Sequence, residues 1–158
     1  MIGWYLNRLK HKLHRDRQLV AYGVGNLTPL VPGHGYLFFD VDFIDHDSII
    51  ESDAVHNMFK YWYKEKYVVL KTKHGVHFVS LVLEPLSDLY KKFQILKSEA
   101  YTDYYWDIPL FLRYSAKYDR KTGEVVSEAP YPISNPSGID VMKFMLSLYP
   151  RKVYYTWD

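Results

Sequence analysis

Two aspartates, Asp40 and Asp42, stand two residues apart in a segment rich in strand-forming residues, 36–44. Side chains two apart on a strand point to the same face, so both carboxylates would lie together. Aspartate is depleted in strands, which makes the pair unusual. Carboxylate oxygens suit Mg²⁺ or Mn²⁺, and such ions assist reactions at phosphate groups. The alternative interpretation is two solvated acids at a strand edge.

His77 and Glu84 are the next candidates, and both lie in an apolar segment expected to form a strand, 76–84. A neutral imidazole can bind a phosphate, transfer a proton or ligate a metal, or simply be a hydrogen-bonded strand histidine. Glu84 could be a metal ligand, a general base or a terminal charge that reaches solvent. The two residues are an odd number apart, so a regular strand turns them to opposite faces. The pattern leaves open which one joins the aspartates.

Basic side chains supply candidate contacts to a phosphate backbone, although the net charge of +2 is too small to indicate a nucleic-acid-binding protein by itself. They cluster near the start of the chain, around residue 72 and in the segment 108–118. The alternative is that they coat a solvated surface. The candidates are Arg15, Arg17, Lys71, Lys73, Arg113 and Lys117.

The elements that would position these residues follow in a regular order from 36 to 118. Strands are expected at 36–44, 67–72, 76–84 and 108–118, with helices at about 47–62 and at 86–100. This order is the split, ferredoxin-like or RRM-like βαββαβ arrangement of an α+β protein. Helices would cover one face of an antiparallel sheet, the other face would be open, and the segments 36–44 and 76–84 would be neighbours. The aspartates would line the open face, because Phe39, Val41 and Phe43 suit the helix-covered face.

The flanking segments complete a single domain over residues 1–158. Residues 1–35 are expected to form a basic helix at 4–17, a short strand at 18–22 and a loop. Residues 119–158 are expected to form a hairpin, a helix and a closing strand at 153–157. Ser137 with Asp140 would cap that helix, and Gly75 would supply a positive φ in the turn at 73–75.

The composition excludes several classes of site. Without cysteine the chain has no disulfide, no thiolate metal ligand and no thiol nucleophile, and an intracellular setting is the default expectation. The apolar runs are far shorter than the roughly 20 residues of a membrane span. The first ten residues lack the apolar region of a signal peptide. The absence of cysteine also suits a protein from a hot environment.

The strand Asp40-Val41-Asp42, the hairpin Gly75-Val76-His77 and the βαββαβ order together resemble the catalytic core of archaeo-eukaryotic primases and related nucleotidyltransferases. The resemblance covers roughly the middle half of the chain. It departs from the family at the third acidic motif, for which Asp107 and Asp119 are the candidates, and the chain has no zinc-binding insert.

The whole chain, small, tyrosine-rich and free of cysteine, is also similar to the small nucleases of filamentous, lipothrix-type archaeal viruses. This resemblance implies a nucleotidyltransferase-like core, the host-cell cytoplasm, and cleavage of linear double-stranded DNA that depends on a glutamate, which Glu84 matches best. We therefore expect a metal-dependent DNA nuclease with Asp40, Asp42, Glu84 and His77 as catalytic residues. Asp40, Asp42 and Glu84 would hold Mg²⁺ or Mn²⁺. The alternatives are a minimal primase-like nucleotidyltransferase and a nucleic-acid-binding module without catalysis.

Overall fold

The computed structural model describes residues 18–43, 47–99 and 111–155. The helix expected at 4–17 lies outside these ranges, and so do Arg15, Arg17 and Asp107. The described chain is mixed α and β, with antiparallel sheets and three helices. None of these helices has the length and apolarity needed to cross a membrane.

A four-stranded antiparallel sheet holds the residues of greatest interest. Its order is β10 (Tyr131–Ser134), β4 (Tyr67–Lys71), β5 (Gly75–Ser80) and β3 (Phe38–Asp42). The expected pairing of the segments 36–44 and 76–84 is confirmed, because β3 lies antiparallel to β5 with Asp40 opposite His77.

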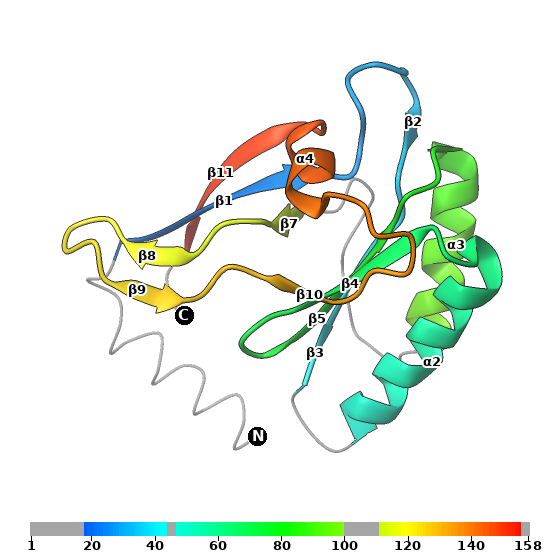
Figure 1. Ribbon diagram of the computed structural model, residues 1–158, viewed down its shortest axis with the longest axis horizontal. Coiled ribbons are helices and arrows are strands. Elements are labelled where there is room, and N and C mark those ends of the chain that lie inside the picture. Colours follow the sequence, from blue (N-terminus) through cyan, green and yellow to red (C-terminus); the bar gives the residue numbers. More distant parts are fainter. Residues whose placement is uncertain (1–17, 44–46, 100–110, 156–158) are drawn as a thin grey trace.

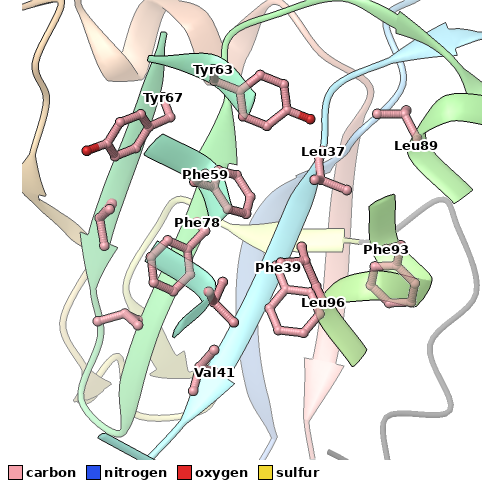
Figure 2. Packing of buried hydrophobic residues seen from close by; sticks show 13 residues of the cluster. Leu37, Phe39, Val41, Phe59, Tyr63, Tyr67, Phe78, Leu89, Phe93 and Leu96 are labelled. Carbon is pink, nitrogen blue, oxygen red and sulfur yellow. The ribbon is translucent and has the colours of Figure 1, made fainter. Parts of the chain in front are cut away.

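Helices α2 (Asp47–Tyr63) and α3 (Leu86–Glu99) cover one face of this sheet (Figure 1). Figure 2 shows the core between them, where aromatic rings from α2, α3 and the strands pack together. In α2 the buried stripe includes Val55 and Phe59, while Ile50 is 61% exposed. Phe39 meets Phe93 edge to face, with ring centroids 5.6 Å apart. Burial of each such ring contributes about 1.5–3 kcal/mol to folding.

A second sheet is built around β1 (Leu19–Gly25), which pairs on one side with β11 (Pro150–Tyr155). On the other side β1 pairs with β7 (Phe111–Arg113) and with β8 (Lys117–Asp119), and β8 pairs with β9 (Val125–Ser127). The strand expected at 18–22 therefore runs on to Gly25. Gly23 allows this, because a Cβ there would lie 2.4 Å from the carbonyl oxygen of Leu112.

Among the residues that the structure describes, the segment 108–118 does not supply the fourth strand of the expected ferredoxin-like core. The segment 108–118 contributes β7 and β8, which both pair with β1 in the second sheet rather than with β3. Between them the chain bends, and the backbone N–H groups of Tyr114 and Ser115 both donate to the carbonyl oxygen of Tyr22. The first sheet gains β10 at its opposite edge instead. The order β3, α2, β4, β5, α3 matches the prediction, and the complete βαββαβ core is not confirmed.

The prediction of an open sheet face is wrong. Phe38, Val68 and Val79 point away from α2 and α3 and are buried. They form a second core with residues of β1, β7 and the short helix α4 (Val141–Leu146). The buried members of this core include Val24, Leu112, Met145 and Leu148. The aspartate face of β3 is therefore turned toward a second layer of structure.

The strand expected at 76–84 is interrupted, and this interruption determines where Glu84 lies. β5 ends at Ser80, and a separate short strand β6 (Glu84–Pro85) pairs with β2 (His34–Gly35). At the break, the N–H of Leu81 donates to the carbonyl oxygen of Lys66, outside the regular strand pairing. Glu84 therefore belongs to a different pair of strands from His77.

Two predicted local features have a different physical basis. Gly75 does not adopt a positive φ; its backbone lies so close to β3 that a Cβ would be 1.9 Å from the carbonyl oxygen of Val41. The cap of α4 is Asp140 itself, whose Oδ1 accepts from the N–H of Lys143 at 3.1 Å, and not Ser137. The turn glycine Gly123 does have a positive φ of 75°.

Candidate functional site

Asp40 and His77 lie side by side on the face of the first sheet that is turned toward the second sheet. They are direct cross-strand partners, and Asp40 Oδ1 is 3.5 Å from His77 Nε2. They share this face with Phe38 and Val79, which belong to the second core. The structure thus answers the question that the strand pattern left open, since His77 accompanies the aspartates.

Burial determines the charges of this pair. The side chain of His77 is 9% exposed and that of Asp40 is 26% exposed. Burial raises the pKa of Asp40 to about 8, with a further rise from the charge of Asp42 and an opposing effect of Arg113. Burial lowers the pKa of His77 to about 3, and Arg113 adds to this effect. At pH 7 the pair therefore consists of a protonated acid and a neutral imidazole.

Two atoms of the pair lack hydrogen-bond partners in the described part of the chain. Asp40 Oδ1 and His77 Nδ1 are both buried, and neither makes a hydrogen bond. Buried polar atoms without partners cost free energy, so they are rare in proteins unless a ligand, an ion or water satisfies them. The Asp40–His77 pair is therefore the candidate site for binding a ligand.

Asp42 lies at the end of β3, on the same face as Asp40 but exposed to solvent, and its strand partner is Gly75. Partial desolvation raises the pKa of Asp42, while the charges of His74 and Lys117 lower it. The acidic site therefore extends from a half-buried carboxyl group at Asp40 to an exposed one at Asp42. Cationic or titratable side chains adjoin its open end.

Arg113 supplies a fixed positive charge beside this site. Its side chain is buried, and Nη1 donates to the carbonyl oxygens of Ser115 at 2.6 Å and of Glu128 at 3.0 Å. Nη2 donates to Ser127 Oγ at 3.3 Å. The guanidinium predicted to contact nucleic acid is thus bound to the protein itself, and it acts on Asp40 and His77 through its charge.

The predicted lysines Lys71 and Lys73 lie at the hairpin between β4 and β5, and Lys71 shares the helix-covered face with its register neighbours Val76 and Val41. Lys71 Nζ donates to the carbonyl oxygen of Thr72 and lies 5.5 Å from the centroid of the Phe43 ring. Lys73 Nζ is 3.4 Å from the carbonyl oxygen of Val126. Both lysines line a pocket of about 340 Å³ between this hairpin and the segment 125–131. Lys117 is half-buried and interacts with Asp42.

Glu84 lies in a different cluster, on the side of the sheet that faces the helices. Its Oε2 accepts a hydrogen bond of 2.7 Å from Tyr63 Oη, and Lys92 Nζ forms an ion pair with Oε1. The Lys92 ammonium also lies over the rings of Tyr63 and Trp62. Glu84 is therefore held by α2 and α3. The structure does not bring it to Asp40 and Asp42.

Asp40 and Asp42 are the carboxyl groups of the acidic site that would offer oxygen ligands to a divalent cation, since both lie on one face of β3 and Glu84 lies elsewhere. Mg²⁺ is commonly held by one or two carboxylates, with water and substrate phosphate as the other ligands. Within residues 18–43, 47–99 and 111–155, no three His, Asp or Glu side chains form a metal-binding group.

Several neighbours of the candidate residues were not identified from the sequence. His74 adjoins Asp42 because it lies in the hairpin turn beside Gly75, and its position next to the Gly-x-His motif was the available signal. His56 Nε2 lies 3.0 Å from Tyr67 Oη in the helix-covered core. Tyr63 and Lys92 gave no sequence signal of their contact with Glu84. Asp119, a candidate third acid, accepts from the N–H of Lys121 within its own turn.

In comparisons with known proteins, no family model, curated protein or solved structure matches this chain.

Proposed function

We propose that this protein is a metal-dependent nuclease that acts on double-stranded DNA at Asp40, Asp42 and His77. The observation that carries the proposal is the Asp40–His77 pair, in which a half-buried carboxyl group and a buried, neutral imidazole meet at 3.5 Å beside the accessible Asp42. Perturbed pKa values and buried atoms without partners are typical of functional sites. The resemblance to small viral nucleases supports DNA as the substrate.

Each residue has a distinct role in this proposal. Asp40 and Asp42 would hold Mg²⁺ or Mn²⁺, and the bound ion would polarise the phosphate and activate water. His77 remains neutral at pH 7 and its low pKa makes it a weak base, so it would act as a hydrogen-bond partner of the reacting group rather than as a proton acceptor. Arg113 would act on the pair through its charge. Lys117, whose charge acts on Asp42, and the hairpin lysines Lys71 and Lys73 would hold the phosphate backbone.

The proposal is tested by cleavage of linear double-stranded DNA in Mg²⁺, Mn²⁺ or EDTA. Asp40→Asn and Asp42→Asn remove carboxylate ligands with little change in shape, and we expect each to lower the cleavage rate by roughly 100-fold or more. Asp88→Asn is the matched control, because Asp88 is an exposed carboxylate on α3. EDTA should abolish cleavage by the unmodified protein.

The Glu84→Gln variant tests whether the Asp40 cluster or the Glu84 cluster is the catalytic one. Glutamine can still accept a hydrogen bond from Tyr63, so the variant should fold and, with the site at Asp40, should keep most of its activity. Loss of cleavage in Glu84→Gln, together with full activity in Asp40→Asn and Asp42→Asn, would move the site to the Glu84 cluster. Absence of cleavage under all metal conditions would reject the nuclease.

A nucleotidyltransferase is the second candidate, and one observation favours it. The two motifs that resemble primases are in register, since Asp40 is opposite His77 and Asp42 is opposite Gly75. The same acids would then act on a nucleoside triphosphate. Incorporation of labelled nucleotide into a primed or unprimed template, lost in Asp42→Asn, would support this activity. Salt-sensitive DNA binding that survives Asp40→Ala, with no turnover in either assay, would indicate a non-catalytic binding module.

A further inference from the structure

An apolar pocket of about 370 Å³ lies on the same sheet face as the acidic site and plays no part in the roles proposed above. Its walls come from β4, β10, Tyr114 and α4. They include Leu70, Tyr114, Pro132, Ile139, Met142 and Met145. A volume above 300 Å³ and mainly apolar walls are typical of sites for small molecules or for single groups of a larger ligand.

The pocket is preformed by hydrogen bonds in the loop that closes it. Asn135 Nδ2 donates to the carbonyl oxygen of Ile139 at 2.9 Å, and Asp140 caps α4 through the N–H of Lys143. Asn135 Nδ2 and Asp140 thus hold the loop, while Asn135 Oδ1 is buried without a hydrogen-bond partner in the described part of the chain. The remaining lining offers ring and thioether surfaces rather than a pattern of donors and acceptors.

Strand register places this pocket next to the acidic site. Asp40, His77, Leu70 and Pro132 form one cross-strand row, because each is the register partner of the next. Neighbouring strands are about 4.8 Å apart, so Leu70 is roughly 5 Å from His77 and roughly 10 Å from Asp40 along this row. Tyr114 directly follows Arg113, whose charge acts on the same pair.

We propose that this pocket binds an unpaired nucleobase of a DNA strand whose neighbouring phosphate lies at Asp40 and Asp42. The inference rests on the proposed nuclease function. Bases stack on aromatic and apolar surfaces regardless of sequence, since every base has a π face, and thioether sulfurs also contact aromatic rings favourably. A paired base is inaccessible to such a pocket. The enzyme would therefore act where strands are unpaired, at frayed duplex ends or single-stranded overhangs, and with little preference among bases.

The experiment measures binding in EDTA, so that it does not depend on cleavage. Duplexes carry 2-aminopurine at a 3′ overhang, at a blunt terminus or at an internal paired position, and quenching of its fluorescence reports stacking. We expect quenching at the overhang and the terminus but not at the internal position. Tyr114→Ala should weaken binding of the overhang duplex by about 5- to 100-fold, which is the usual contribution of stacking one base.

A second variant keeps the test valid if Tyr114→Ala fails to fold. Met142 is 47% exposed at the pocket rim, so Met142→Lys should fold while placing a long cation across the apolar opening. We expect this variant to abolish the quenching. Tyr90→Ala is the control, because Tyr90 is a half-exposed tyrosine on α3, outside the pocket.

The outcomes separate this inference from the proposed function. Metal-dependent cleavage without quenching at any position would reject the proposed nucleobase pocket. The proposed nuclease activity would then be retained. Quenching that disappears in both pocket variants, without cleavage, would support the pocket and reject the nuclease. Displacement of the oligonucleotide by dATP at a lower concentration than by unlabelled strand would assign the pocket to a free nucleotide and overturn the strand assignment.

Discussion

At the scale of single residues, the Asp40–His77 pair links the pH dependence of folding to the candidate site. In the unfolded chain the two groups have ordinary pKa values of 3.8 and 6.5, while in the folded protein the values are about 8 and about 3. The folded protein thus retains a proton on Asp40 that the unfolded chain has lost above pH 4. Conversely, the unfolded chain binds a proton on His77 below pH 6.5 that the folded protein excludes.

This exchange predicts a characteristic stability profile in the absence of metal. Between pH 4 and 6.5 the two effects cancel, because each state holds one proton on the pair. From pH 6.5 to 8 only Asp40 differs, so the free energy of unfolding should fall by up to about 1.4 kcal/mol for each pH unit. Asp40→Asn should remove this decline. Urea unfolding in EDTA at pH 5, 6.5 and 8 measures it, and an equal decline in both proteins would contradict the assignment.

The sequence was enough to predict which residue types form the candidate site. It only partly predicted which of the residues lie together. The period of a strand was enough to place Asp40 and Asp42 on one face, and His77 beside them was one of two possibilities. The position of Glu84 relative to the aspartates stayed open. The odd spacing between His77 and Glu84 fixes their faces only if the strand is unbroken. The break after Ser80 depends on contacts with Lys66 and β2 that no local pattern encodes.

At the scale of elements, the hairpin between β4 and β5 is fitted against β3 through Gly75. A methyl group at this position would lie 1.9 Å from the carbonyl oxygen of Val41, and backbone cannot move aside easily. We expect Gly75→Ala to lower the free energy of unfolding by about 1–3 kcal/mol. The substitution should also loosen the Asp40–His77 contact two residues away.

Chemical denaturation of Gly75→Ala and of Gly123→Ala distinguishes close approach from backbone strain. Gly123 has a φ of 75° and open space around it, so its substitution tests conformational strain alone, at a cost of about 1–2 kcal/mol. Cleavage activity gives a second measurement, since Gly75→Ala should reduce it and Gly123→Ala should not. If Gly75→Ala left stability and activity unchanged, β3 would have to move away from the added methyl group, which would contradict this prediction.

Secondary structure was largely predictable where the elements are long. The apolar stripes of α2 and α3 and the β-branched and aromatic residues of β3, β4 and β5 indicate their types directly. The segment 108–118 was read as one strand because its residues favour strands throughout. In the folded protein a bend at 114–116 divides it, and the bend is stabilised by Tyr22 and therefore by tertiary contact.

At the scale of the whole molecule, Arg113 joins the second sheet to the segment that leads into the first. Its guanidinium, carried by β7, holds the carbonyl oxygens of Ser127 and Glu128, just before the chain continues into β10. Lysine keeps the charge but cannot present a planar fork to several acceptors. We expect Arg113→Lys to lower the free energy of unfolding by about 2 kcal/mol or more.

The matched control for this substitution is Arg120→Lys, because Arg120 is exposed in the turn between β8 and β9. Thermal and urea unfolding of the two variants give the comparison. Equal stabilities would mean that the hydrogen bonds of Arg113 contribute little. Cleavage activity in Arg113→Lys should also fall, because the charge beside Asp40 is displaced.

The arrangement of two sheets was the part of the fold that the sequence did not reveal. Strand patterns show which residues face inward, but they do not show which strand lies opposite. The partners of β1 come from three distant segments, β7, β8 and β11. Asp40 was therefore expected to lie on an open face, and it lies instead beside a second core.

The pairing of β1 with β11 also orders events during synthesis of the chain. Leu19 pairs with Tyr155, so β1 acquires this neighbour only when the segment 150–155 has left the ribosome. Until then β1, with Leu19, Val20, Ala21 and Val24 fully buried in the finished protein, has one edge and much apolar surface uncovered. The hairpin of β4 and β5 and its helices have partners close in sequence and can assemble early. The nascent β1 is thus an apolar segment that needs protection from aggregation during synthesis.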